Sequence, residues 1–371
     1  MNQKLKEFAG PIAIFFIIVI ALYFNIENEL TIRINHLTEN AKNVVAFDVV
    51  KEKGNISIYF CPKDNCEEHL NDLIKSANES VYCAFYDVKL DSLAETIGKA
   101  KKEGIDVKII IDDHTAQNKN SKYDELGQIL GENIKTDEKR STGKYNNLMH
   151  DKFCVIDNKT VFTGSFNPTD RGAHQNNNNM LVITSEYLAK NYMEEFYEMQ
   201  NDEFGDRDSQ AVSVPVVELE NTGYGNVKIE NYFCPEDNCK KHVIDTINRA
   251  NSSIYFCTFS FTEANTRDAL LNATKRGVKI YGLFDKTQAG SKYSVFDEMK
   301  NQNNSNIYIY KDSNPAFMHH KFFVIDEIIT ITGSMNPTQS GYFYNDENII
   351  IIENPLIGQM YKEEYDSNRE N

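Results

Sequence analysis

The sequence contains 371 residues, of which 41% are hydrophobic, so it can bury one large core or two medium ones. Its 55 acidic and 39 basic residues give a formal net charge of −16, which disfavours a broad nucleic-acid-binding surface because such a surface must attract phosphates. A local basic cleft is still compatible with this charge, and an acidic balance also serves solubility.

An apolar segment at residues 8–24 is the first feature along the chain. Its seventeen uncharged residues are at the short end of what spans a bilayer. Lys4 and Lys6 precede the segment, and Glu27 and Glu29 follow it. By the positive-inside tendency, we expect residues 1–28 to form a cytoplasmic tip and an uncleaved single-pass transmembrane helix, with the catalytic part extracytoplasmic. A cleaved signal peptide and a buried core helix are the alternatives, although no small-x-small cleavage site follows.

A repeated octapeptide then divides the chain into two similar halves. The sequence YFCPKDNC at residues 59–66 returns as YFCPEDNC at residues 232–239, so Cys61 and Cys234 are 173 positions apart. A gene duplication explains this repeat better than convergence does. The expected order along the chain is a stalk (29–54), the first half (55–204), an exposed linker with Gly223 and Gly225 (205–228), and the second half (229–371).

Each half is predicted to alternate strands with helices. In the first half we expect strands at residues 81–85 and 107–111 and helices at residues 93–102 and 187–199. The second half repeats this order, with strands at residues 254–259 and 278–284 and helices at residues 268–275 and 356–365. Such alternation predicts an α/β fold in which helices cover mixed sheets. The polar stretch at residues 115–148, with a helix at 123–130, is interpreted either as a lid or as a surface loop.

The seven cysteines fall into two groups. Four of them form two Cys-x4-Cys pairs, each with a Pro and an Asp-Asn turn between its members: Cys61 with Cys66, and Cys234 with Cys239. Outside the cell, two local disulfides are the natural interpretation, while a metal site that joins all four cysteines and free thiols are the alternatives. The other three lie in apolar strands and are interpreted as small core residues: Cys83, Cys154 and Cys257.

Residues 150–167, with the sequence HDKFCVIDNKTVFTGSFN, predict a buried hairpin with polar residues at its ends. Two short strands are joined by a tight turn at Asp157. His150 and Lys152 are two positions apart, so on a strand their side chains leave the same face. Ser165 and Asn167 repeat this spacing after the second strand. An imidazole, an ammonium and two neutral hydrogen-bonding groups suit a single anion, and a phosphate diester fits that set.

The same pattern returns at residues 319–336 as HHKFFVIDEIITITGSMN. The matching positions are His319, Lys321, Asp326, Ser334 and Asn336, which lie 169 residues after their counterparts. Two copies of H-x-K-x4-D-x6-G-S-x-N in one chain resemble the phospholipase D superfamily, and the resemblance covers residues from about 55 to 365. It implies two similar halves that pack about a pseudo-twofold axis as a monomeric catalytic unit, with the active site between them.

Two facing histidines are sufficient for phosphodiester cleavage without a metal or a cofactor. One neutral imidazole attacks phosphorus and forms a covalent phosphohistidine, while the other, protonated, gives its proton to the leaving oxygen. The groups expected to bind the non-bridging oxygens are Lys152, Lys321, Asn167 and Asn336, with Ser165 and Ser334 in support. Asp157 and Asp326 lie at hairpin turns and are interpreted as structural.

The resemblance also implies a carboxylate, after each G-S-x-N element, that supports the histidine of the opposite half. Fourteen residues after the motif glycine, the second half has Glu347, whereas the first half has Asn178. If the family's crossing holds, Glu347 supports His150 as the nucleophile, and Asn178 faces His319 as the general acid. The alternative is that Asn178 is a loop residue and the two histidines are equivalent. His320 is expected to point away from the site.

These features predict a membrane-anchored phosphodiesterase of the phospholipase D type that hydrolyses or transfers phospholipid head groups. The apolar N-terminal segment motivates the choice of a lipid substrate, because an anchor holds the active site next to a bilayer. A nuclease that cleaves DNA or RNA is the alternative enzyme, and an inactive scaffold is the non-enzymatic one. A basic groove with stacking aromatic residues would favour nucleic acid, and an apolar rim would favour lipid.

Overall fold

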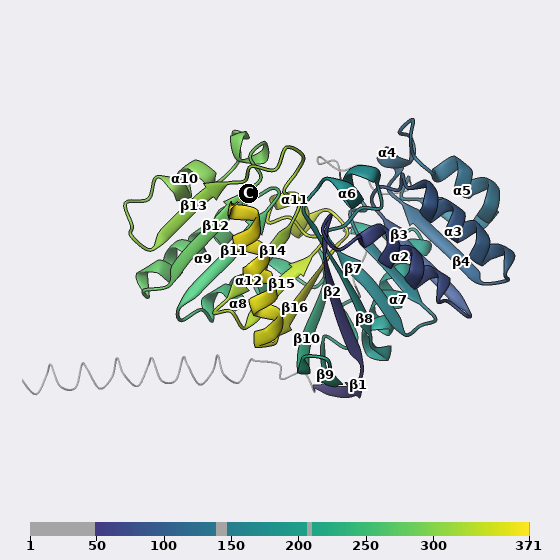
Figure 1. Cartoon of the computed structure of the whole chain (residues 1–371), viewed down its shortest axis with the longest axis horizontal. Helices are drawn as coiled ribbons and strands as arrows, with labels where there is room; N and C mark the ends of the chain where they lie inside the picture. The colour runs from purple at the N-terminus through teal and green to yellow at the C-terminus, as the bar shows by residue number, and fades with distance from the viewer. Residues whose placement is uncertain (1–48, 139–146, 206–209, 371) are drawn as a thin grey trace, which may run out of the picture. The chain divides into compact units, whose positions relative to one another are not determined.

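The computed structural model describes residues 49–138, 147–205 and 210–370 (Figure 1). The apolar segment at residues 8–24 and most of the expected stalk lie outside these ranges. Among the helices of the described ranges, none combines the length and the apolar character that a membrane span requires. Residues from Val49 onward belong to one compact unit that contains both halves of the repeat.

The first half is built on a seven-stranded mixed sheet with the order β2-β8-β7-β6-β3-β4-β5. Its strands are β2 (Asn55–Cys61), β3 (Ser80–Phe85), β4 (Asp106–Ile111), β5 (Ile134–Thr136), β6 (Lys152–Ile156), β7 (Thr160–Gly164) and β8 (Asn178–Thr184). Strands β3, β4 and β5 are parallel to one another, and the other neighbours are antiparallel. The motif hairpin β6–β7 therefore lies in the middle of this sheet, where both faces are buried.

The second half repeats this order in a nine-stranded sheet, β1-β9-β10-β16-β15-β14-β11-β12-β13. Its strands are β1 (Val50–Lys53), β9 (Val216–Thr222), β10 (Gly225–Cys234), β11 (Ser253–Thr258), β12 (Lys279–Phe284), β13 (Ile307–Lys311), β14 (Lys321–Ile325), β15 (Ile329–Gly333) and β16 (Glu347–Glu353). The last seven strands of this order, from β10 to β13, correspond one to one to the seven strands of the first half. The predicted duplication is therefore visible in the topology.

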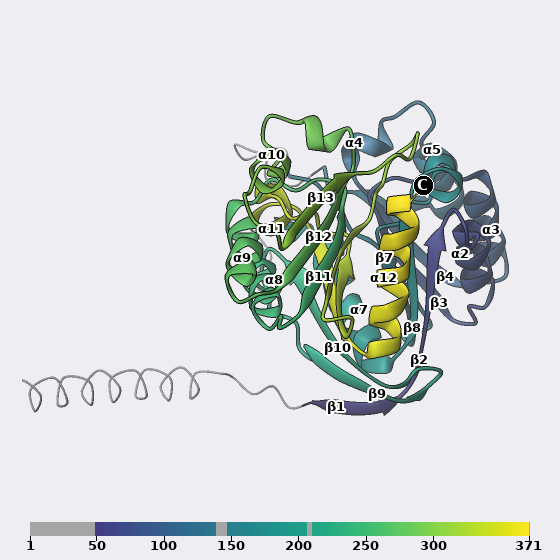
Figure 2. The ribbon, with the colours of Figure 1, turned by 60° about the vertical axis from the view of Figure 1, so that its left-hand side comes forward.

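Helices cover both faces of each sheet, because successive residues of a buried strand point to opposite sides. In the first half, Val81 of β3 packs with α2 (Cys66–Lys75), α3 (Asp91–Lys102) and α5 (Tyr123–Leu130), whereas Tyr82 packs with α7 (Glu186–Gln200). In the second half, one face of the sheet holds α8 (Cys239–Asn248), α9 (Ala264–Lys275) and α10 (Phe296–Lys300), and the other holds α12 (Pro355–Glu370) (Figure 2). Three shorter helices are α4 (Asp113–Ala116), α6 (Asp170–His174) and α11 (Gln339–Phe343).

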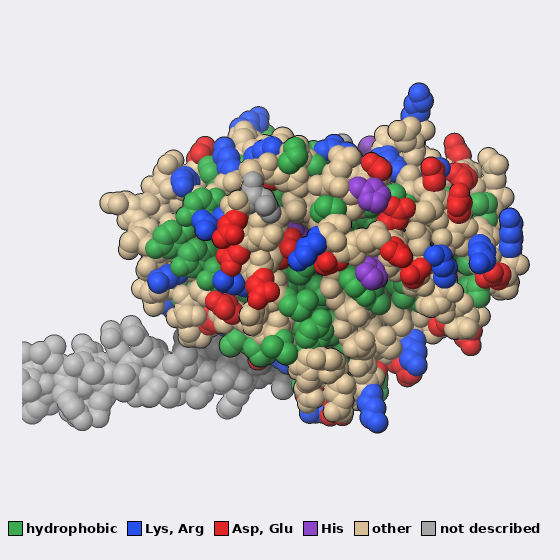
Figure 3. Space-filling view, in the orientation of Figure 1, with side chains coloured by type: hydrophobic (Ala, Val, Ile, Leu, Met, Phe, Trp, Pro, Cys, Tyr) green, Lys and Arg blue, Asp and Glu red, His purple; other side chains and the backbone are tan. Residues whose placement is uncertain are grey.

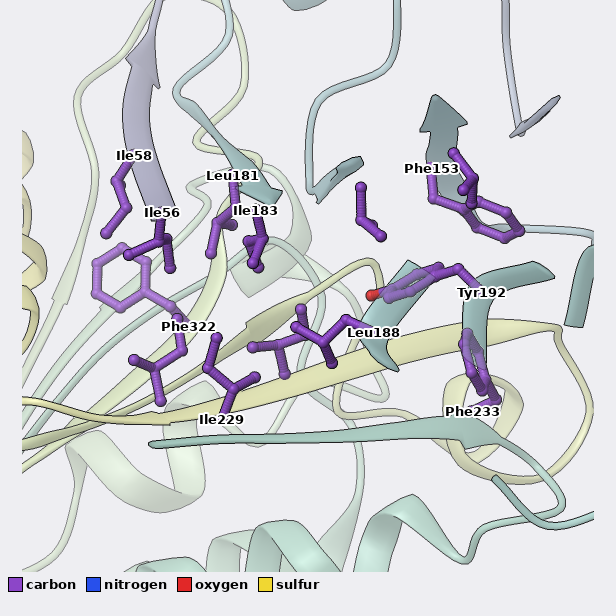
Figure 4. Packing of buried hydrophobic residues seen from close by; sticks show 14 of the residues in the cluster. Ile56, Ile58, Phe153, Leu181, Ile183, Leu188, Tyr192, Ile229, Phe233 and Phe322 are labelled. Carbon is purple, nitrogen blue, oxygen red and sulfur yellow. The ribbon is translucent and has the colours of Figure 1, made fainter. Parts of the chain in front are cut away.

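One hydrophobic core joins the two halves (Figure 4). Ile56 and Tyr192 come from the first half, and Phe233 and Phe322 come from the second. The rings of Tyr192 and Phe233 meet edge to face, with their centroids 5.0 Å apart. Because this core is shared, separating the halves would expose a large apolar surface to water, which is unfavourable.

The expected stalk and the expected exposed linker both contain strands. Strand β1 lies at the end of the stalk range and pairs in parallel with β9, which lies within the linker range. Val216 and Val217 of β9 are buried, so this part of the linker range belongs to the core and is not exposed. Gly54 connects β1 in one sheet to β2 in the other, where a β-carbon would lie 2.3 Å from a backbone oxygen of Thr184.

On one face of the second sheet, three tyrosines of neighbouring strands stack. Tyr281 lies between Tyr255 and Tyr308, with centroid distances of 4.7 and 4.9 Å. Figure 3 shows hydrophobic side chains gathered over β12 and β13, beside α12, and Figure 1 shows that no helix of the described chain crosses these strands on that side. Cross-strand aromatic pairs of this kind stabilise a sheet edge.

Six of the seven cysteines form disulfides in the structure. Two of these bonds join the local pairs Cys61–Cys66 and Cys234–Cys239. The interpretation of Cys83 and Cys154 as unpaired core residues is wrong, because they face each other on β3 and β6 and are bonded. The equivalent positions of the second half are Phe256 and Phe323, whose rings pack 5.4 Å apart. Cys257 is free and buried, and burial raises the pKa of its thiol.

Candidate active site

The backbone brings each motif histidine against the opposite half. The residue before His150 forms a bridge with Asp346, and the His150 N–H donates to the Asp346 carbonyl at 3.0 Å. In the same way Met318 forms a bridge with Asn177, and the His319 N–H donates to the Asn177 carbonyl at 2.9 Å. Each histidine therefore lies beside the first residue of the opposite strand, β16 or β8. These first residues are Glu347 and Asn178, so the structure shows the crossed arrangement that the sequence predicts.

His150 contacts a buried carboxylate. Its Nδ1 lies 2.8 Å from Oε2 of Glu347, whose other oxygen accepts a hydrogen bond of 3.2 Å from Asn345. When Glu347 is ionised, its carboxylate can only accept, so His150 then carries its proton on Nδ1 and its Nε2 has a free lone pair. Burial, together with Lys152 and Lys321, lowers the pKa of His150, and burial raises the pKa of Glu347 to about 7.

His319 contacts an amide in the equivalent place. Its Nδ1 lies 2.8 Å from Oδ1 of Asn178. The Asn178 amide has a defined orientation, because its Nδ2 donates to the carbonyl of Gly172 at 3.0 Å and a carbonyl can only accept. The amide oxygen therefore faces His319, accepts from Nδ1–H and leaves Nε2 toward the opposite side of the ring. Burial and the nearby Lys321 and Lys152 lower the pKa of His319.

The two motif lysines are buried beside the histidines. Lys152 is 0% exposed and Lys321 is 3% exposed. Each ammonium donates to the carbonyl oxygen of the histidine two residues before it, which fixes its position. Burial lowers the pKa of Lys152 to about 8 and lowers that of Lys321 as well. A bound phosphate would raise both values, because a nearby anion favours the ammonium form.

A cavity of about 1120 Å³ lies between the halves and is lined by His150, His319, Asn167 and Asn336. The first half adds uncharged residues such as Tyr86 and Leu148, and it also adds seven charged ones: Asp87, Lys89, Asp91, Lys119, Lys122, Asp170 and Arg171. The second half adds the uncharged residues Phe259, Ser260, Gln288 and Phe317. Residues 119–122 belong to the stretch expected as a lid or a surface loop, so part of it lines the cavity. The side chains with a fixed charge on the cavity wall therefore come from the first half, and the second half contributes neutral and aromatic ones.

The two motif asparagines differ in their partners. The side-chain oxygen of Asn336 accepts a hydrogen bond of 3.3 Å from the backbone N–H of Ser260. The equivalent oxygen of Asn167 is buried and has no hydrogen-bond partner among the described residues. Both asparagines line the cavity, so both can donate through their Nδ2 atoms to an anion there.

The motif serines lie below the cavity and contact the residues that support the histidines. Ser165 donates to Oδ1 of Asn178 at 3.1 Å and accepts from the N–H of Asn179 at 3.0 Å. Ser334 accepts from the N–H of Asn348 at 2.9 Å and lies 3.4 Å from a carboxylate oxygen of Asp151. Both serines are fully buried. The serines therefore hold the first residues of β8 and β16 in place, and they do not line the cavity.

The motif aspartates lie in the two hairpin turns and are not among the residues that line the cavity. Asp157 accepts hydrogen bonds from the N–H groups of Asn78, Glu79 and Ser80 at 2.8–2.9 Å. Asp326 accepts the equivalent three bonds in the second half at 2.8–3.0 Å. These contacts tie each motif hairpin to the start of the neighbouring strand, β3 or β11.

His320 lies in the interface between the halves. It is fully buried, its Nε2 lies 3.0 Å from Oε1 of Glu364, and its Nδ1 faces Asn179 at 3.5 Å. The equivalent residue of the first half is Asp151, which accepts a hydrogen bond of 2.5 Å from Asn348. Both residues thus reach an asparagine of the opposite half. Sequence reasoning missed this contact of Asp151, whose only signal was its position 169 residues before His320.

An aromatic ring packs on each histidine, and sequence reasoning missed both. Tyr86 lies 4.7 Å from His150 between ring centroids, and Phe259 lies 4.7 Å from His319. The two residues follow equivalent strands and are 173 positions apart, the same offset as the repeated cysteines. This shared offset is the sequence feature that identifies Tyr86 and Phe259 as equivalent residues.

Comparisons with known proteins agree with this architecture. The family model described as the PLD-like domain of cardiolipin synthase matches residues 70–200 and 243–369. A phospholipase D of Rickettsia felis is 34% identical over 134 residues, which are 36% of this chain and 66% of that protein. A mitochondrial cardiolipin hydrolase of Chlamydomonas reinhardtii is 27% identical over 123 residues, 33% of this chain and 54% of that protein. The aligned parts thus span slightly less than two thirds of the first relative and about half of the second.

A solved structure extends the comparison to both halves. The crystal structure of phosphatidylserine synthase from Haemophilus influenzae matches with a TM-score of 0.67, covering 89% of this chain and 90% of that one. The sequence identity is 14%, so this match concerns the fold alone. Both halves of this chain carry the H-x-K motif, and the two matched segments of the family model cover more than half of its length. The chain therefore belongs to the phospholipase D superfamily, within the family described by the PLD-like domain of cardiolipin synthase.

Proposed function

We propose that this protein is a membrane-anchored phosphodiesterase that cleaves phospholipid head groups, by hydrolysis or by transfer to another alcohol, through a phosphohistidine intermediate. The observation that carries the proposal is the pair of crossed contacts, Glu347 on His150 and Asn178 on His319. Both leave an imidazole Nε2 free, and both imidazoles border the same cavity.

In the first step Nε2 of His150 attacks phosphorus. A P–N bond forms, the P–O bond to the leaving alcohol breaks, and Nε2–H of the protonated His319 gives its proton to the leaving oxygen. Glu347 stabilises the positive charge that develops on the His150 ring, which an amide does only weakly. The lysines and asparagines of the motifs neutralise and orient the non-bridging oxygens.

In the second step His319 reverses its role. Its neutral Nε2 takes a proton from water, the water oxygen attacks phosphorus, and the P–N bond to His150 breaks. An alcohol in place of water gives transfer instead of hydrolysis. His319 needs a proton at the start, and the anionic phosphodiester favours this state because it raises the pKa of an adjacent imidazole.

The aromatic wall of the cavity supports a lipid substrate. Phe259 and Phe317 line the cavity from the second half, with ring centroids 5.3 Å apart, so this wall offers an apolar surface to the acylglycerol part of a phospholipid. Residues 8–24 support the membrane anchor by their composition, with the N-terminus in the cytoplasm and the catalytic part outside. The names of the relatives, a phospholipase D and a cardiolipin hydrolase, point the same way.

Cleavage of nucleic acid is the second candidate, and the charged wall of the first half favours it. Lys119 and Arg171 border the cavity without an ion pair among the described residues, and Arg171 lies 4.6 Å over the ring of Phe317. Arginine stacked on an aromatic ring is a feature of single-strand binding. On the face shown in Figure 3, however, acidic and basic side chains are interspersed, and no broad basic surface extends over it.

The decisive experiment offers both substrates to the full-length protein in detergent micelles. Phosphatidylglycerol and phosphatidylethanolamine in mixed micelles are compared with single-stranded DNA, with EDTA present. We expect release of the head-group alcohol from the lipids and intact DNA. Cleavage of DNA alone would replace the lipid proposal with the nuclease, and loss of all turnover in EDTA with recovery on adding a divalent cation would refute the two-histidine mechanism. The double variant His150→Asn, His319→Asn is the control for a contaminating enzyme.

A further inference from the structure

The rings of Tyr86 and Phe259 occupy equivalent positions. The Tyr86 ring is inclined by 58° to His150, and the Phe259 ring is inclined by 61° to His319. Lys152 Nζ lies 5.1 Å from the centre of the Tyr86 ring, and Lys321 Nζ lies 5.2 Å from that of Phe259. Because packing on the histidine and the lysine is the same in both halves, the ring itself does not distinguish them.

The hydroxyl of Tyr86 is the difference between the two halves at this position. Tyr86 is partly exposed and lines the cavity. Within the described parts of the chain, its hydroxyl has no hydrogen-bond partner, although three acidic residues lie near enough to affect it. Burial, together with Asp112, Asp87 and Glu347, raises the pKa of Tyr86 to about 12. The phenol thus stays protonated at neutral pH and can donate a hydrogen bond.

We propose that the Tyr86 hydroxyl donates a hydrogen bond to a non-bridging oxygen of the phosphoryl group that is transferred to His150. This inference rests on the proposed function and adds a substrate-contacting residue outside the repeated motifs. The phosphoryl group is bonded to His150, and Lys152 provides its positive charge from the same side. Tyr86 packs its ring on both of these residues and lines the same cavity, and this is the basis for assigning its hydroxyl to the group that they hold.

The consequence is a difference in donors between the two sides of the phosphorus. On the side of His150, the phosphoryl group meets Lys152, Asn167 and the phenol. On the side of His319, it meets Lys321 and Asn336 beside a ring that cannot donate. The extra donor therefore stabilises the group on His150, the residue with the carboxylate support, so both asymmetries favour the same nucleophile.

A reciprocal exchange tests this inference. The full-length protein is compared in micelles as wild type, Tyr86→Phe, Phe259→Tyr and the double exchange, using bis(p-nitrophenyl) phosphate for turnover and inorganic phosphate for binding by calorimetry. Tyr86→Phe should lower kcat/KM and weaken phosphate binding by about tenfold each, the cost of one hydrogen bond to a charged group. Phe259→Tyr should change both by less than about twofold, because its ring borders the general acid. The double exchange should behave like Tyr86→Phe.

The results separate this inference from the proposed function. If wild type turns over neither the diester nor lipids, the proposed function fails, and phosphate binding still reports on Tyr86. If wild type is active and Tyr86→Phe keeps both its kcat/KM and its phosphate affinity, the inference is overturned. An equal loss in Phe259→Tyr would also overturn it. Any change to either ring would then lower activity, whether a hydroxyl was removed or added. The melting temperature of Tyr86→Phe should match that of wild type, since the packed ring remains.

Discussion

Glu347 and His150 are separated by 197 residues in the chain, and their side chains meet at 2.8 Å across the boundary between the halves. The equivalent contact, between Asn178 and His319, has the same length but lacks the negative charge. The two histidines of the repeated motif are thus placed alike and supported differently. This difference underlies the first three predictions below.

The first prediction concerns the covalent intermediate. Replacing His319 by Asn should leave attack by His150 possible on bis(p-nitrophenyl) phosphate, since p-nitrophenolate departs without protonation. A phosphoryl adduct on His150 should then accumulate, because the base that activates water is missing. Peptide mapping by mass spectrometry under alkaline conditions locates the adduct. His150→Asn is the matched control and should form none; an adduct on His319 in that variant would reverse the assigned roles.

The second prediction compares the two supporting residues. Glu347→Gln removes the charge that stabilises the His150 cation, and it should lower kcat by about a hundredfold, the typical effect of losing an electrostatic support. Asn178→Ala removes a neutral contact of His319 and should cost less, about tenfold or below. Steady-state rates on lipid micelles measure both. Equal losses would mean that the two histidines have equivalent roles.

The third prediction is a bell-shaped dependence of kcat/KM on pH with bis(p-nitrophenyl) phosphate, whose leaving group departs without the proton of His319. Burial raises the pKa of Glu347 to about 7, and the ionised carboxylate is the supporting form, so the rate should rise as pH increases through that value. Burial lowers the pKa of Lys152 to about 8, and the ammonium is the phosphate-binding form, so the rate should fall at higher pH. The maximum is expected between these values. In Glu347→Gln the acid limb should lose this component, and a profile identical to wild type would exclude Glu347 as its source.

The fourth prediction separates folding from catalysis. Burial alone would raise the pKa of Asp157, but the N–H groups of Asn78, Glu79 and Ser80 outweigh it and lower that pKa. The resulting stabilisation is complete above about pH 4, the pKa in the unfolded chain, and is lost as pH falls through the lower native value. Asp157→Ala should therefore lower the free energy of unfolding by about 2 kcal/mol at pH 7.

This loss is measured by urea titration at pH 7 and should shrink in acid. Lys159→Ala, an exposed residue of the same turn, is the control and should change stability by less than about 0.5 kcal/mol. The kcat of the folded fraction should remain that of wild type in both variants. A large fall in kcat for folded Asp157→Ala would show that the aspartate acts in catalysis as well.

The fifth prediction concerns the disulfide that sequence reasoning missed. Protein purified from an oxidising compartment, denatured and alkylated without reductant, should carry label on Cys257 alone. The double variant Cys83→Ala, Cys154→Ala should be less stable by about 2–4 kcal/mol, whereas Cys257→Ala should lose less. Label on Cys83 and Cys154 in the wild-type protein would contradict the bond.

Much of the site was predictable from the sequence, because the motif spacing fixes strand faces and the repeat fixes equivalence. His150 and Lys152 share a strand face by periodicity, and the positions of Glu347 and Asn178 follow from their distance to the motif glycines. The duplicated octapeptide marks equivalent positions in the two halves, at the ends of β2 and β10. These signals are spacings of residues along the chain, so a single sequence is enough to reveal them.

Contacts between distant segments were not predictable in the same way. Strands β8 and β16 begin with polar residues that are buried only because they meet the opposite half. In the sequence, the first residues of these strands therefore resemble loops. Cys83 and Cys154 become partners only through the register of β3 and β6, which no local pattern specifies. Tyr86 lies just beyond β3, and His150 lies just before β6. Their contact depends on the pairing of the end of β3 with the start of β6.

The crossed supports also bear on how such a site can change over evolutionary time. In a symmetric dimer of one half, every surface meets its own copy, so both imidazoles would face identical side chains. A substitution that suited the proton donor would then alter the attacking residue as well. With both copies in one polypeptide, position 178 can hold an amide while position 347 keeps its acid. Covalent fusion thus allows the two histidines to have different supporting side chains.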